Sequence, residues 1–132
     1  MDKTRVTFPD RNLEGVIRKA LNKPEGSIYT SDLEYINTLD GESRGISDLT
    51  GLEHCVNLQW LYLHTNNISD ISALAELSDL KKLDLIGNNI SDISALASLT
   101  NLEHVHLDFN NISDISPLAG LINLKYLDIT KD

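Results

Sequence analysis

The sequence NNISDISALA occurs twice, at residues 66–75 and 88–97, and NNISDISPLA follows at residues 110–119. The three segments start 22 residues apart, and the wider unit LxxLxLxxNxISDISxLAxLxx extends on both sides of them, from Gly45 to the end of the chain. A fixed period of this length means that each unit is one structural repeat, stacked on its neighbours to bury a continuous core. The repeat therefore decides the fold before any local structure is considered.

Apolar and polar residues alternate at the centre of each unit, as at Leu83, Asp84 and Leu85. This alternation indicates a short strand with one face toward the core. Strands from successive units should lie about 4.8 Å apart and pair in parallel. We therefore predict an α/β fold, a right-handed leucine-rich-repeat solenoid with a single curved parallel sheet of about five strands on the concave face and short helical turns on the convex face.

Three polar columns recur in register with the strands. They are the asparagines Asn66, Asn88 and Asn110, the aspartates Asp48, Asp70, Asp92 and Asp114, and the serines Ser72, Ser94 and Ser116. We expect each asparagine to satisfy backbone groups where the chain turns inward, and each aspartate to accept backbone N–H groups of its own turn. A calcium ladder is the alternative for the aspartates. The serines are expected to cap the convex helical turns.

Residues 1–44 do not follow the period, as expected of a terminal unit that covers the open end of the core. Five apolar residues there share one face of a helix: Leu13, Val16, Ile17, Ala20 and Leu21. Ser31 and Glu34 have the spacing of a capping box, which predicts a second short helix. We therefore predict an N-terminal helical cap at residues 1–44 and leucine-rich repeats at residues 45–132, the last of them incomplete.

The cap sequence FPDRNLEGVIRKAL at residues 8–21, the partial repeat GISDLTGLEHCVNL at residues 45–58 and the three tandem units resemble the internalin family of bacterial surface proteins. The resemblance covers nearly the whole chain. It implies an adhesion or invasion role in which concave aromatic and charged residues recognise a host or cell-surface protein. It also implies a secreted or cell-surface location. Residues 1–10 lack the apolar stretch of a signal peptide, so this expectation rests on the resemblance alone.

The positions that alternate with the core leucines vary between repeats while the framework does not, and we expect them to face outward on the concave sheet. Large aromatic and ionic side chains gather there, as is typical of a binding hot spot. The candidate partner-binding residues are Trp60, Tyr62, His64, Lys82, Asp84, His104, His106, Asp108, Phe109, Tyr126 and Asp128. We therefore predict a protein–protein interaction module, with a merely solvated strand face as the alternative.

A metal site on the concave face is a second alternative. The polar side chains of residues 104–108, His104, His106 and Asp108, should point one way, and Asp84 and Asp128 should flank His106 on neighbouring strands. Such a group could hold zinc or a related ion. An open sheet offers no pocket that excludes water, however, so we assign no metal and no cofactor.

The sequence also argues against an enzyme. Cys55 is in register with leucines of the later repeats and is expected to be a core residue with an inert thiol. Neither a glycine-rich phosphate loop nor an HExxH pattern is present. We predict no catalytic residues.

Charge and hydropathy limit the partners. The chain has 20 acidic and 11 basic residues and a formal net charge of −9, which disfavours nucleic acid. Its apolar runs are shorter than the roughly 18 residues that a membrane span needs, so membrane insertion is not expected. The chain ends at LDITKD just after a predicted strand, and self-association through that uncapped edge is expected.

The origin of the chain is a separate question. Residues 67–75 and 89–97 are identical, which is also typical of an engineered or consensus scaffold, or of a fragment without its own partner. This interpretation stays open beside the binding module and the metal site.

Overall fold

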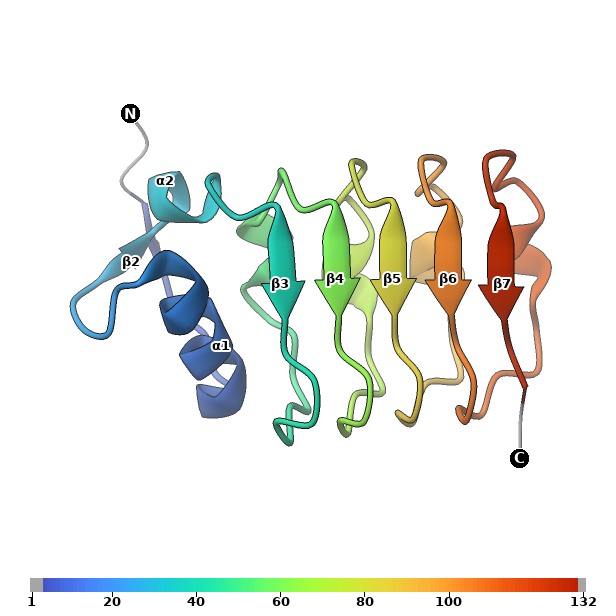
Figure 1. Ribbon diagram of the computed structural model, residues 1–132, viewed down its shortest axis with the longest axis horizontal. Coiled ribbons are helices and arrows are strands. Elements are labelled where there is room, and N and C mark those ends of the chain that lie inside the picture. Colours follow the sequence, from blue (N-terminus) through green and yellow to red (C-terminus); the bar gives the residue numbers. More distant parts are fainter. Residues whose placement is uncertain (1–3, 131–132) are drawn as a thin grey trace.

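A computed structural model describes residues 4–130 of the chain (Figure 1). Five of its strands form one parallel sheet in the order β3-β4-β5-β6-β7. These are β3 (Thr38–Asp40), β4 (Trp60–Tyr62), β5 (Lys82–Asp84), β6 (His104–His106) and β7 (Tyr126–Asp128). Each strand pairs with the next at the period of the sequence, as Leu61 does with Leu83. The predicted leucine-rich-repeat solenoid, with about five strands, is confirmed.

Short 3-10 helices lie between the strands along the chain. They are η1 (Leu52–His54), η2 (Ser72–Leu74), η3 (Ser94–Leu96) and η4 (Ser116–Leu118). Each of these helices contains a buried leucine; Leu74 and Leu96, for example, are 0% exposed. The helices contact one another in sequence order, so they form a second column that stacks in parallel with the strands.

The asparagine column joins neighbouring coils through their backbones. Asn88 Nδ2 donates to the carbonyls of Leu63 at 3.1 Å and Leu85 at 3.0 Å, and Asn88 Oδ1 accepts the N–H of Ile68 at 3.0 Å. Asn66 and Asn110 are buried in the same way. Among the described residues, no buried side-chain nitrogen or oxygen lacks a hydrogen-bond partner. The expectation that this ladder satisfies backbone groups is confirmed.

The aspartate column caps the 3-10 helices, and the serine prediction is wrong. Asp70 Oδ1 accepts the N–H of Ser72 at 2.9 Å, and Asp92 does the same for Ser94. Each serine is the first residue of its helix, so its N–H is the group that needs a partner. The aspartate two residues earlier reaches that group, which confirms the expected role of the aspartates.

The N-terminal segment packs at the β3 end of the sheet (Figure 1). Its helix α1 (Arg11–Leu21) buries Leu13, Val16 and Ile17. Asp10 Oδ1 accepts the N–H groups of Asn12 and Leu13 at the start of α1. Two short strands, β1 (Arg5–Val6) and β2 (Ile28–Tyr29), pair in antiparallel fashion in a separate sheet.

Asp10 also ties α1 to the first repeat. Its second carboxylate oxygen accepts the N–H groups of Ser47 at 2.7 Å and Asp48 at 3.0 Å. Partial burial opposes ionisation of Asp10, but the backbone N–H groups that donate to it outweigh burial and lower its pKa.

The second helix begins earlier than the sequence predicted. Helix α2 (Thr30–Leu33) follows β2 without a break, and the Asp32 carboxylate accepts the N–H of Tyr29 at 2.8 Å. The predicted Ser31 and Glu34 capping box is therefore wrong. The N–H of Thr30 donates to Thr4 O at 2.9 Å, so pairing with the first strand continues up to the residue where the chain must turn into the helix.

One hydrophobic core runs through the described residues. Residues on both sides of the predicted boundary between residues 44 and 45, such as Leu39 and Ile46, lie in it, and that boundary stays a prediction. Burial falls at the last strand, where Leu127 is 37% exposed although Leu61 and Leu83 in the same column are 0% exposed. No helix in residues 4–130 is long and apolar enough to cross a membrane.

Candidate protein-binding surface

The residues that alternate with the buried leucines lie on the outer surface of the sheet, which we call the strand face. It consists of Thr38, Asp40, Glu42, Trp60, Tyr62, His64, Lys82, Asp84, Ile86, His104, His106, Asp108, Tyr126 and Asp128. The backbone pairing continues past the strand ends, since Leu63 N donates to Asp84 O and Gly41 N donates to Tyr62 O. The ladder therefore holds residues such as Glu42 and His64 in line with those on the strands.

The structure places ten of the eleven predicted binding residues on the strand face, and none of them is buried. The eleventh, Phe109, lies at the rim, where it is 52% exposed and has a positive φ of 61°. Trp60 and Tyr62 are half-buried, so only part of each side chain is accessible to a partner. Positions predicted from the alternation are thus accessible, while their role in binding stays a prediction.

An aromatic cluster, His104, His106 and Tyr126, lies at the β6 and β7 end of the strand face. The Tyr126 ring centroid is 5.3 Å from that of His106 and 6.3 Å from that of His104. His106 Nδ1 lies 2.9 Å from Asp128 Oδ2, which fixes the imidazole against the neighbouring strand. Tyr126 is 50% exposed, so this cluster combines the oriented His106 ring with an accessible tyrosine ring. Such a combination is typical of a protein-binding hot spot.

Lys82 and Tyr62 form a second aromatic contact near the middle of the sheet. Lys82 Nζ lies 5.3 Å from the centroid of the Tyr62 ring, which is within the range of a cation–π interaction. Carboxylates along the whole strand face make it acidic. They are Asp40, Glu42, Asp84, Asp108 and Asp128, whereas Lys82 is the one lysine or arginine among the residues that define this face.

A different group of ionisable residues lies at the β3 to β5 end. His64 Nε2 is 2.6 Å from Glu42 Oε1, and one ligand atom from each of Glu42, His64 and Asp84 lies within 4.8 Å of the other two. Glu42 was not among the residues predicted from the sequence, because it lies in the region assigned to the cap. The signal was its position 22 residues before His64, which puts it in the same column.

The metal-ligand set that the sequence analysis kept as an alternative is not brought together as one group among the described residues. In residues 4–130, the His, Cys, Asp and Glu group close enough to share an ion is Glu42, His64 and Asp84. Asp108 instead accepts the backbone N–H of Thr130 through its Oδ1, and His106 pairs with Asp128. Asp84 is in register with His106, yet its carboxylate belongs to the group at the other end.

Cys55 has the structural role that its register predicted. It is 0% exposed, and burial, with a smaller contribution from the charge of Glu53, raises the pKa of its thiol to about 12. A thiol with that pKa is protonated at neutral pH and is a poor nucleophile.

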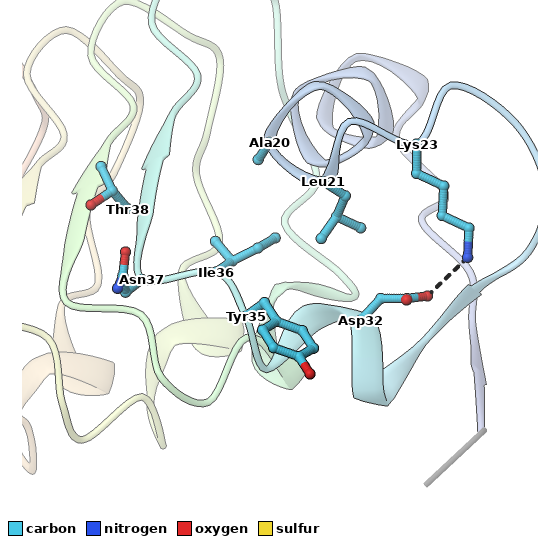
Figure 2. Close-up of a pocket in the computed structure, with 8 residues that line it drawn as sticks. All are labelled: Ala20, Leu21, Lys23, Asp32, Tyr35, Ile36, Asn37 and Thr38. Atoms are coloured by element: carbon cyan, nitrogen blue, oxygen red, sulfur yellow. Dashed lines mark hydrogen bonds and ion pairs between the residues drawn. The ribbon is translucent and has the colours of Figure 1, made fainter. Parts of the chain in front are cut away.

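A hollow of about 360 Å³ lies between α1, α2 and the start of β3 (Figure 2). Its lining consists of Ala20, Leu21, Lys23, Asp32, Tyr35, Ile36, Asn37 and Thr38. Figure 2 shows Lys23 reaching Asp32 across one side, and their ion pair measures 3.1 Å. The charged groups of the hollow are therefore paired with each other. Tyr35 is 86% exposed at its edge.

Comparison with known proteins supplies a family model and several structures. Residues 56–98 and 100–132 match the model described as Leucine Rich repeats (2 copies). No curated protein matches the chain in sequence.

Three of the similar solved structures are internalins of Listeria monocytogenes. InlF is 34% identical with a TM-score of 0.85, over 92% of this chain and 43% of its own. Internalin C2 is 32% identical with a TM-score of 0.75, over 98% of this chain and 69% of its own. The functional domain of InlJ is 23% identical with a TM-score of 0.89, over 96% of this chain and 29% of its own, and supports the fold alone. This chain thus spans less than half the length of InlF and InlJ.

Proposed function

The chain belongs to the internalin family of bacterial leucine-rich-repeat proteins, and on that premise we propose that it is a non-catalytic module that binds a partner protein through its strand face. Leucine-rich-repeat and internalin-like domains mediate protein–protein interaction. One observation carries the proposal. The repeat fixes the core leucines and the asparagine ladder, whereas the outward positions differ from repeat to repeat and include Trp60, Tyr62 and Tyr126.

The proposed contacts are the predicted residues on the strand face, together with Phe109 at its rim. Tyr126 and Phe109 expose about half of their surface, so a partner that covers them removes apolar area from water. The carboxylates along the strand face favour a partner with a basic surface, because complementary charge raises the association rate. A host or cell-surface protein and a secreted or cell-surface location for this chain are part of the proposal.

A capture experiment tests this proposal. The chain is immobilised and exposed to a host-cell surface extract, beside a variant with Trp60→Ala, Tyr62→Ala and Tyr126→Ala. The matched control carries Tyr35→Ala, Val56→Ala and Ile122→Ala, which remove exposed apolar side chains away from the strand face. Because Trp60 and Tyr62 are half-buried, the single variant Tyr126→Ala is measured as well, and circular dichroism checks the fold of each protein.

We expect the parent and the control to recover the same protein and the strand-face variants to lose it. Equal recovery by all folded proteins would remove the strand face as the binding site. If the parent recovers nothing, the engineered or consensus scaffold becomes the better account. Self-association through the β7 end is tested separately by sedimentation, in which a dimer that Leu127→Lys converts to a monomer is expected.

A further inference from the structure

Three side chains from three successive coils converge near the N-terminal end of the strand face. Glu42 follows β3, His64 follows β4, and Asp84 is the last residue of β5. Their ligand atoms lie within 4.8 Å of one another, and all three side chains are partly exposed. Because they come from paired coils, their backbones are held by the strand ladder and by the hydrogen bonds that extend it. The convergence is therefore built into the fold.

The His64 ring already has the orientation that a metal ligand needs. Its Nε2 faces the Glu42 carboxylate at 2.6 Å, and its Nδ1 lies 3.2 Å from Thr65 Oγ1. A histidine that binds a metal through one nitrogen usually donates the other N–H to an acceptor, which orients the ring and raises its basicity. The Thr65 hydroxyl can accept that N–H, and it can donate to Nδ1 when Nε2 carries the proton, so it supports the ring in both states.

The two carboxylates are not neutralised by basic side chains. Among residues 4–130, no lysine or arginine lies within ion-pair distance of Glu42 or Asp84. Lys82, on the same strand as Asp84, is placed over the Tyr62 ring instead. Asp84 Oδ1 accepts the N–H of Ile86 at 3.2 Å, which orients the carboxylate. The site thus presents a local negative charge with one imidazole in it.

This donor set decides which cation fits. One imidazole nitrogen with two carboxylate oxygens suits Zn²⁺ and its neighbours in the first transition row. Ca²⁺ prefers six to eight oxygen ligands and gains little from a histidine. In a tetrahedral zinc site with bonds near 2.0–2.1 Å, ligand atoms lie about 3.3 Å apart. His64 Nε2 and Glu42 Oε1, at 2.6 Å, must therefore move apart by about 0.7 Å when the metal replaces the contact between them, while no other pair of ligand atoms needs to close by more than roughly 1.5 Å. Rotation of the partly exposed carboxylates can supply both movements.

We propose that Glu42, His64 and Asp84 form a mononuclear site for a divalent transition-metal cation, with zinc as the best match. Three protein ligands leave at least one coordination position for water or for a donor group from a bound molecule. The site does not depend on the proposed partner, because all of its ligands come from this chain. It differs from the alternative metal set suggested by the sequence, which centred on His104 and His106.

Isothermal titration calorimetry, in which ZnCl₂ alone is titrated into the metal-free full chain, tests the proposal. We expect saturable binding of one zinc per chain. His64→Ala should weaken it at least about a hundredfold, and Glu42→Gln and Asp84→Asn about tenfold or more each, since each removes one of three ligands. His104→Ala is the matched control, because it removes a histidine from the same sheet face without touching the site, and it should leave the affinity unchanged.

The three ligands are partly exposed, so the variants should unfold at the same temperature as the parent in the presence of a chelator. Failure of the folded parent to bind zinc would overturn the proposal. So would equal binding by parent and His64→Ala, or loss of binding in His104→Ala or His106→Ala instead. Because no partner protein is present in the titration, its failure leaves the protein-binding proposal untouched.

Discussion

Replacement of Asn88 by alanine should destabilise the solenoid far more than its position between coils suggests. Asn88 is 6% exposed, and its amide makes three short hydrogen bonds to backbone groups of two coils. The magnitude depends on which of those groups find another partner. Leu63 O still accepts from Asn66 Nδ2, and Leu85 O still accepts from Asn110 Nδ2. The buried N–H of Ile68 has Asn88 Oδ1 as its acceptor and would lose it.

The expected cost follows from that difference. A buried N–H without an acceptor costs about 1–3 kcal/mol, and each hydrogen bond to a carbonyl that keeps another donor contributes about 0.5–1.5 kcal/mol. Together these give a loss of about 4 kcal/mol in the free energy of unfolding, within a range of about 2–6 kcal/mol. The loss is a large part of the total stability expected for a domain of this size.

Urea unfolding followed by circular dichroism measures this loss, with Asn89→Ala as the matched control. Asn89 is the next residue, is exposed, and makes no side-chain hydrogen bond with the described residues. Its replacement should change the free energy of unfolding by less than about 0.5 kcal/mol. If Asn88→Ala costs no more than Asn89→Ala, the account of the ladder as a set of obligatory backbone acceptors and donors is refuted.

Three further predictions concern the N-terminal segment and the core. Asp10→Ala should cost about 1 kcal/mol or more, because it removes an N-cap and two contacts to the first repeat. The pKa of Asp10 is lowered from 3.8 in the folded protein, so its contribution to the free energy of unfolding is fully present above pH 3.8. That contribution is lost as the pH falls through the lower pKa of the folded state. In an acid titration the parent should therefore lose this part of its stability, whereas Asp10→Ala should not. Gly51→Ala should cost about 1–3 kcal/mol in thermal unfolding, since Gly51 has a φ of 105° and an added Cβ would lie 2.6 Å from the Phe8 ring. The same change at Gly15, where a Cβ would meet open space, should be tolerated. Cys55 should resist alkylation by iodoacetamide at pH 8 until the protein unfolds, because its thiol is buried with a pKa of about 12; fast labelling of the folded chain would contradict its place in the core.

The repeat is the reason why so much of the fold could be predicted. In a stacked solenoid each coil contacts its neighbours at a fixed period, so residues such as Leu61 and Leu83 that align in the sequence are neighbours in space. The strands, the asparagine ladder and the core position of Cys55 all follow from that translation. The same rule makes Glu42 a neighbour of His64. This contact was not predicted, because the assigned repeats began at residue 45.

The errors arose where a choice between nearby side chains depends on backbone geometry. Asp70 rather than Ser72 caps η2 because Ser72 has already entered the helix and its own N–H faces the aspartate. Asp32 rather than Glu34 caps α2 because strand pairing of β2 continues to the helix start. The spacing of these residues in the sequence is compatible with either capping residue at each helix.

Side-chain direction set the limit on the candidate site. Register correctly placed His104, His106 and Asp128 on one face, but register cannot say which carboxylate an imidazole selects. His106 turns to Asp128, and Asp108 turns to the backbone of Thr130, so the residues of the alternative metal set do not converge on one point. The group that does converge includes His64, whose ring is oriented by contacts with Glu42 and Thr65 that no sequence pattern encodes.

Site-specific photocrosslinking tests the central claim, that the strand face binds a partner protein, most directly. A photoreactive phenylalanine analogue is placed at Tyr126 in one protein and at Tyr35 in another, because both tyrosines are exposed and only Tyr126 lies on the strand face. Each protein is irradiated in the host-cell surface extract. The account predicts a covalent adduct with one partner at position 126 and none at position 35. An adduct at position 35 alone, or equal adducts at both positions, would contradict it.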